Sequence, residues 1–173
     1  MKVINRNLSA YYLPISIILI LSFTRLIPHP WNFTPVLAIG IFSGFYFKNL
    51  YLGLFIIIFS MFIGDLYLGF HSTMFFTYIS LIAAVVIGCL IKHFKLSEIL
   101  LGGLASSIIF FIITNFGAWL TLEMYEKNFS GLINSYILAI PFFHNTLIST
   151  LVYLVLIKLF FNYVIEKKLS QQA

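Results

Sequence analysis

Residues 50–69 read LYLGLFIIIFSMFIGDLYLG, an apolar run with a single charged side chain, Asp65. As a helix rising 1.5 Å per residue, this run is roughly 30 Å long, which matches the hydrocarbon thickness of a bilayer. A strand of a membrane barrel would alternate polar and apolar residues, and this run does not. The stretch therefore predicts a transmembrane helix.

The rest of the chain has the same character. Of its 173 residues, 61% are hydrophobic and only 9% are charged, whereas a soluble domain has about 25% charged residues. This composition excludes a water-soluble enzyme, a nucleic-acid-binding protein and a receptor with a large extramembrane domain, despite a net charge of +5. We expect an integral, all-α membrane protein.

Apolar runs bounded by charge, proline or glycine predict six transmembrane helices in one domain, residues 1–173. They cover about residues 10–27, 33–47, 50–69, 74–91, 97–121 and 142–162. Residues 122–141 fit either a short interfacial or re-entrant helix ending at Pro141, or the top of a sixth helix kinked at this proline. The single Cys89 excludes an internal disulfide and a cysteine-cluster metal site.

Lysine and arginine predict the orientation of these helices, because they favour cytoplasmic loops. With the amino terminus inside, only Arg25 and Lys127 fall on the outer side. The cytoplasmic side collects Lys2, Arg6, Lys48, Lys92, Lys95, Lys158, Lys167 and Lys168. We therefore expect both termini in the cytoplasm and a multi-pass protein of the bacterial inner membrane.

Small residues at helical spacing predict close helix packing. Gly40 and Gly44 form a GxxxG motif, and Ala84 and Gly88 repeat the small-xxx-small spacing. Such faces serve either packing within one bundle or homodimerisation, and a compact bundle favours the first.

Polar residues gather toward the predicted outer side, and Asp65 is the sharpest of them. A carboxylate at this depth costs up to about 2.5–3.5 kcal/mol if it faces lipid, so Asp65 should point into the bundle. It fits either a functional group in a wet cavity or a structural ion pair with Arg25 at the same depth. Asn115, near the outer end of residues 97–121, fits either a ligand contact or an interhelical hydrogen bond.

The segment 25–35, RLIPHPWNFTP, contains three prolines that force an extended path. It would hold His29, Trp31 and Asn32 rigidly over the mouth of the bundle, where an aromatic and amide loop suits a flat polar ligand. The alternative is a proline-rich corner that ends a helix and anchors Trp31 at the interface.

A short echo relates residues 70–73, FHST, to residues 143–146, FHNT. Each precedes an apolar run, so the third residue of each is a candidate N-cap. Two helix N-termini, with His71 and His144 beside them, could hold a carboxylate or phosphate, although capping alone explains Ser72 and Asn145. The histidines show no local metal-ligand spacing, so neither a metal site nor a cofactor is predicted.

Four blocks carry a family resemblance: residues 25–35, GDLYLGFH at 64–71, NFGAW at 115–119 and IPFFHNT at 140–146. They resemble an uncharacterised bacterial family of small membrane proteins assigned to transport. More loosely, that family resembles the substrate-binding S-components of energy-coupling factor (ECF) vitamin transporters.

The looser resemblance implies six helices, an outward pocket roofed by loops, and capture of a vitamin or precursor. It also implies docking on a coupling subunit with two ATPases, through an AxxxA face on the first helix. The first helix here, with Ala10-Tyr11-Tyr12-Leu13-Pro14, lacks this repeat. Docking on such a module and action without it both stay open.

The sequence thus predicts a protein of the lipid bilayer that binds a small polar solute from outside and mediates its uptake. The expected ligand contacts are Asp65, His71, Asn115, His144 and Asn145, below a loop with Arg25, His29, Trp31 and Asn32. One alternative is an intramembrane enzyme in which Asp65 orients a histidine, although no ATPase or hydrolase motif is present. Another is a cell-envelope scaffold, for which a dry Asp65–Arg25 pair would suffice.

Overall fold

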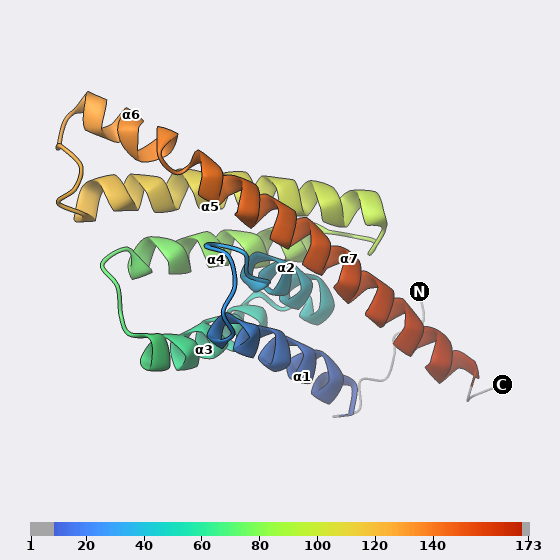
Figure 1. The fold of residues 1–173 in the computed structure, drawn as a ribbon. Helices are drawn as coiled ribbons and strands as arrows, with labels where there is room; N and C mark the ends of the chain where they lie inside the picture. The colour runs from blue at the N-terminus through green and yellow to red at the C-terminus, as the bar shows by residue number, and fades with distance from the viewer. Residues whose placement is uncertain (1–8, 171–173) are drawn as a thin grey trace.

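The computed structural model describes residues 9–170. Side chains are described for residues 12, 15, 16, 18–20 and 22–163. Lys2 and Arg6 lie outside the described residues, and the side chains of Lys167 and Lys168 lie outside the described side chains. The regular structure of the described part is entirely helical (Figure 1).

The chain forms seven α-helices and one short 3-10 helix within the described residues. They are α1 (Ser9–Phe23), η1 (Thr24–Leu26), α2 (Val36–Phe47), α3 (Leu50–Leu68), α4 (Met74–Leu90), α5 (Leu96–Thr121), α6 (Phe129–Ile137) and α7 (Ile140–Ser170). Each of the six predicted ranges overlaps one of α1 to α5 or α7, and α7 is longer at both ends than predicted. Residues 122–141 contain a separate short helix, α6, which ends at Ile137 rather than at Pro141.

Three helical segments are long and apolar enough to cross a membrane by length and composition. They are Leu50–Leu68, Leu96–Thr121 and Ile140–Tyr163. The helices Val36–Phe47 and Met74–Leu90 are apolar but shorter. The composition and these helices together indicate a membrane protein.

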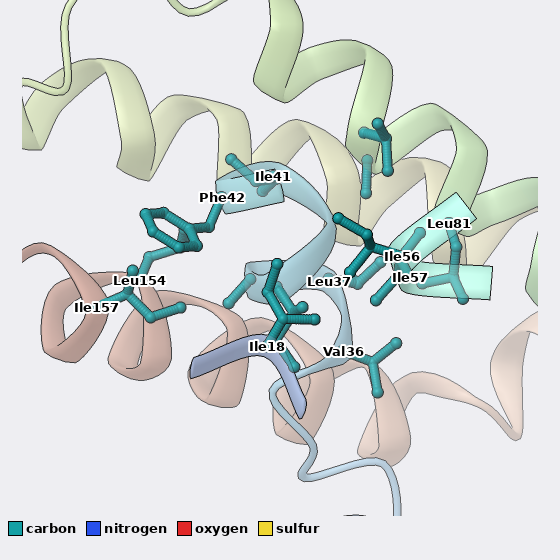
Figure 2. Close-up of a cluster of buried hydrophobic side chains, with 14 of the residues drawn as sticks. Ile18, Val36, Leu37, Ile41, Phe42, Ile56, Ile57, Leu81, Leu154 and Ile157 are labelled. Carbon is teal, nitrogen blue, oxygen red and sulfur yellow. The ribbon is translucent and has the colours of Figure 1, made fainter. Parts of the chain in front are cut away.

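Helix α2 is the centre of the bundle. It contacts α1, α3, α4, α5 and α7, and 10 of its 12 residues are buried. A helix that is apolar around its whole circumference belongs in a core. Figure 2 shows Phe42 of α2 beside Leu154 and Ile157 of α7, and all three side chains are almost fully buried.

The GxxxG face of α2 packs against the small-residue face of α4. A Cβ atom on Gly44 would lie 2.0 Å from the carbonyl oxygen of Val85, and one on Gly88 would lie 2.1 Å from that of Ile41. Gly40 faces Ala84 in the same interface. The small residues of α2 and α4 therefore pack against each other within the chain.

The loops lie at two opposite ends of the bundle (Figure 1). One end, called the lysine end below, contains residues 48–49 and 91–95. There Lys48 donates a hydrogen bond to the carbonyl of Ile91, and Lys158 donates one to that of Phe94 at 2.5 Å. The other, called the polar end, contains the loops 27–35, 69–73 and 122–128.

Candidate functional site

Asp65 is buried at the polar end of α3, with 1% of its surface exposed. Arg25 Nη2 donates a hydrogen bond to Asp65 Oδ1 at 2.9 Å, and the Tyr78 hydroxyl of α4 donates one to Oδ2 at 2.7 Å. Both carboxylate oxygens are therefore occupied. The ion pair named as the structural alternative for Asp65 is present in the structure.

The backbone of α3 makes room for the Arg25 guanidinium. A Cβ atom on Gly64 would lie 3.1 Å from Arg25 Nη1, so the glycine lets the charged group lie against the helix. The same Nη1 contacts the sulfur of Met61 at 3.1 Å. The cluster ties η1, α3 and α4 together at the polar end, and it places no histidine on Asp65.

A cavity lies at the polar end between α5 and α7. Its volume is about 60 Å³, which is small beside the roughly 300–1,000 Å³ of pockets for drug-sized ligands. It has room for a few waters or for a solute of a few heavy atoms. The residues that line it are Asn32, Phe110, Phe111, Thr114, Asn115, Ala139, Phe142, Phe143 and Thr146.

The cavity borders the break between α6 and α7. Pro141 lies in the first turn of α7, where proline is tolerated, but it has no N–H to give to the carbonyl of Ile137. Leu138 and Ala139 form a short non-helical junction between α6 and α7. This junction contributes Ala139 to the lining of the cavity.

Helix α6 is held on α5 beside this break. The Tyr136 hydroxyl donates a hydrogen bond to the carbonyl of Ile112 at 3.0 Å, and its ring packs on Phe111. A phenol is protonated at neutral pH, and burial raises the pKa of the Tyr136 phenol further, so this hydroxyl remains a donor.

The polar side chains of the two helices donate to their own helices. Thr114 Oγ1 donates to the carbonyl of Phe110 at 2.7 Å, and Thr146 Oγ1 donates to that of Phe142 at 3.0 Å. Asn115 Nδ2 donates to the carbonyl of Phe111 at 2.7 Å. The oxygen atoms of these three side chains keep their lone pairs for other partners.

The loop 27–35 closes the polar end above this cavity. Asn145 Nδ2 of α7 donates a hydrogen bond to the carbonyl of Trp31 at 2.9 Å, while the Trp31 side chain is 80% exposed. Asn32 has a φ of 60°, a left-handed conformation that asparagine adopts more readily than most residues. This hydrogen bond and the left-handed turn at Asn32 bring the Asn32 side chain to the lining of the cavity.

The structure divides the predicted site residues into three groups. Asn32 and Asn115 line one cavity, and Asn145 of α7 donates a hydrogen bond to the carbonyl of Trp31 in the loop above it. Arg25 and Asp65 form the ion pair and are not among the lining residues. The three predicted histidines, His29, His71 and His144, are exposed and line no part of the cavity.

The predicted N-caps are wrong. Helix α7 begins at Ile140, so Asn145 lies inside it and holds the loop instead. The N-cap of α4 is Thr73 rather than Ser72, and His71 Nδ1 lies 2.9 Å from the Thr73 hydroxyl. The echoed tetrapeptides therefore do not place two helix N-termini around an anion.

Several residues of the site were not identified from the sequence: Tyr78 as the second partner of Asp65, and Thr146 and the four phenylalanines as cavity lining. Thr146 could have been found from its place in the sequence, because it is a polar residue only five positions after Pro141, where a helix break was expected. No comparable signal marked Tyr78. Within the described residues, no group of three or more His, Cys, Asp or Glu side chains comes together in a way that could hold a metal ion.

The fold and the site define an all-helical protein with helices apolar enough to cross a membrane and a small, partly polar cavity at one end. The chain belongs to DUF6580, a family of unknown function, whose model matches residues 5–172. No curated protein and no solved structure matches the chain significantly.

Proposed function

We propose that this chain is a six-helix protein of the bacterial cytoplasmic membrane that binds a small polar solute at its polar end and mediates its uptake. The observation that carries the proposal is the cavity between α5 and α7. It combines two amide and two hydroxyl groups with aromatic walls, and ligand sites have this composition of mostly apolar walls with a few polar groups.

In the proposed topology, α1 to α5 and α7 cross the membrane and α6 lies near the outer interface. Lysine distribution supports this orientation, since Lys48 and Lys158 lie at the lysine end with Lys92 and Lys95. The polar end then faces outward. A solute would enter beneath the loop 27–35.

The size of the cavity bears on the solute. A vitamin or precursor exceeds about 60 Å³, so its binding would require the loop 27–35 to move. A hydrogen bond from Asn145 to the carbonyl of Trp31 holds this loop on α7. A solute of a few heavy atoms would fit without such a movement.

The energy for uptake would come from a partner or from the solute gradient. The resemblance to S-components supports an ECF-type coupling subunit with ATPases as that partner, whereas the absence of an AxxxA repeat on the first helix supports action without it. Nothing in the composition supports a nucleic-acid partner.

A scaffold role is the second candidate, and the Asp65 cluster favours it. Arg25, Asp65 and Tyr78 satisfy one another, as structural groups do. The enzyme alternative has less support, because Asp65 orients tyrosine and arginine side chains rather than a histidine.

Native mass spectrometry of the protein purified from its own membranes tests solute binding. We expect a small bound molecule on the unmodified protein that is lost in Asn115→Leu. The control is Asn134→Leu, the same change at an exposed position of α6 that does not line the cavity. Equal retention of a bound molecule in both variants would contradict solute binding at this cavity and leave the scaffold role.

A further inference from the structure

We infer that the cavity between α5 and α7 selects a small primary ammonium ion. This inference rests on the proposed solute binding and names the class of solute. It follows from the hydrogen-bonding polarity, the charge, the aromatic walls and the size of the lining.

Hydrogen-bonding polarity comes first. A threonine hydroxyl has one proton to donate, and Thr114 and Thr146 give theirs to the carbonyls of Phe110 and Phe142. Each hydroxyl therefore meets a ligand only as an acceptor. A ligand at these positions must bring its own N–H or O–H groups.

Asn115 adds an acceptor of fixed orientation. Its Nδ2 donates to the carbonyl of Phe111, and a carbonyl accepts hydrogen bonds but cannot donate them, so the amide cannot be turned around without losing this bond. Oδ1 is thereby directed away from that carbonyl. The three helical side chains Thr114, Asn115 and Thr146 thus offer a ligand three acceptor oxygens and only one donor, the second N–H of Asn115.

The walls favour a cation over a neutral donor. Phe110, Phe111, Phe142 and Phe143 line the cavity, and the rings of Phe111 and Phe143 lie 5.0 Å apart at 54° to each other. Aromatic faces attract ammonium groups through their quadrupole. No lining residue carries a charge, so nothing in the lining repels a cation and nothing pairs with an anion.

An ammonium ion fits the acceptor oxygens of Thr114, Thr146 and Asn115. An ammonium group has three donors and no acceptor. Its hydrogen-bonding pattern is thus the complement of these three helical side-chain oxygens, while Asn32 of the loop 27–35 adds a second amide to the lining.

Size limits both the ligand and its affinity. About 60 Å³ admits only a few heavy atoms, and methylammonium has two. The upper limit of binding energy per heavy atom for very small ligands sets a Kd for methylammonium of about 6 mM or weaker. The test therefore needs a method suited to weak, fast exchange.

Saturation-transfer NMR provides it, with the full chain in lipid nanodiscs at pH 7 and methylammonium chloride, methanol or acetate as probes. We expect saturable transfer from the aromatic walls to methylammonium and much weaker transfer to the other two. Thr114→Val should weaken methylammonium binding about tenfold, because it removes an acceptor without changing the shape of the side chain. Thr121→Val is the matched control, since Thr121 makes the same bond to its own helix outside the cavity.

Asn115→Asp is a second variant that distinguishes a specific loss of binding from a loss caused by misfolding. A carboxylate there should tighten methylammonium binding about tenfold, a gain that a misfolded protein cannot give. The inference is overturned if methylammonium does not bind, or if methanol or acetate binds as tightly as methylammonium. It is also overturned if Thr114→Val and Thr121→Val change the affinity for methylammonium equally.

Failure of this inference is distinguishable from failure of the proposed function. A neutral or anionic molecule that is found by native mass spectrometry and depends on Asn115 would refute the ammonium preference and support solute binding. If neither that experiment nor the NMR titration detects a ligand, both proposals are wrong.

Discussion

The guanidinium of Arg25 and the carboxylate of Asp65 lie 2.9 Å apart and join η1 to α3. Their side chains are 14% and 2% exposed, so the two charges depend on each other rather than on solvent. Removing one partner of a buried pair leaves the other charge uncompensated, whereas replacing both by apolar groups is often neutral.

Asp65→Asn should therefore lower the free energy of unfolding by about 3 kcal/mol. Tyr78→Phe, which removes one hydrogen bond to the same carboxylate, should lower it by about 2 kcal/mol. Denaturant unfolding in mixed micelles, followed by circular dichroism, measures both values.

The double variant Arg25→Met with Asp65→Leu is the control for this prediction. We expect its free energy of unfolding to lie within about 1 kcal/mol of that of the unmodified protein. If the double variant is as unstable as Asp65→Asn, the two charges do not compensate each other and the interpretation of the pair is wrong.

A second prediction concerns the contact between α2 and α4. Gly44→Ala and Gly88→Ala should each destabilise the bundle by about 3 kcal/mol, because the added methyl group would meet backbone carbonyl oxygens about 2 Å away. Gly102→Ala should be close to neutral. Its Cβ would meet only side-chain methyl groups, Cγ2 of Ile87 at 3.1 Å and Cδ1 of Ile91 at 3.2 Å, and no backbone atom, and alanine favours the helix by about 1 kcal/mol.

Thermal unfolding of the three variants in the same detergent checks the order. Equal loss in Gly44→Ala and Gly102→Ala would contradict close backbone packing. A loss of dimer rather than of stability in Gly44→Ala would support the homodimer alternative for the GxxxG motif.

Helix positions could be predicted because charges, prolines and glycines separate the apolar runs. Lys48 and Asn49 mark the turn between α2 and α3, and the side chain of Asn49 indeed accepts a hydrogen bond from the Leu52 amide at the start of α3. The central place of α2 could not be predicted in the same way. Its residues are apolar on every side, and in a membrane protein a lipid-facing helix is apolar as well.

The site was predictable only in part. Equal depth in two helices indicated the pairing of Arg25 with Asp65, but depth alone does not say which face of α4 carries Tyr78. Pro141 suggested a helix end, whereas proline is also tolerated in a first turn, and α7 therefore starts earlier than expected. This shift makes Asn145 a contact of the loop rather than a cap.

A third prediction concerns topology. In a Cys89→Ser background, Ser72→Cys should react with a membrane-impermeant maleimide on intact cells. Ser97→Cys should react only after the cells are permeabilised. Both serines are exposed. Ser72 lies in the loop 69–73 at the polar end and Ser97 in the first turn of α5 at the lysine end, so a difference in labelling reports the side of the membrane rather than burial. The reverse labelling pattern would refute the proposed orientation, and labelling of both from outside would refute the assignment of the two ends to opposite sides.

A fourth prediction concerns the loop 27–35, which is tied to α7 through Asn145 and Trp31. Asn145→Leu removes the donor at similar volume, and an exposed hydrogen bond contributes about 0.5–1 kcal/mol, so the fold should persist while the loop gains freedom. In a Trp119→Phe background, time-resolved fluorescence anisotropy reports on Trp31 alone, since the chain has two tryptophans. We expect faster depolarisation in Asn145→Leu.

The matched control for the loop is Asn162→Leu, the same change at an exposed position of α7 near the lysine end. It should leave the depolarisation of Trp31 unchanged, because Asn162 is far along the helix from Asn145. If the loop is the roof of a solute site, Asn145→Leu should also lose the bound molecule during native mass spectrometry more readily than Asn162→Leu, since a looser roof raises the dissociation rate. Faster motion of Trp31 with unchanged retention would separate the two roles: Asn145 would then order the loop, and the loop would not hold the solute.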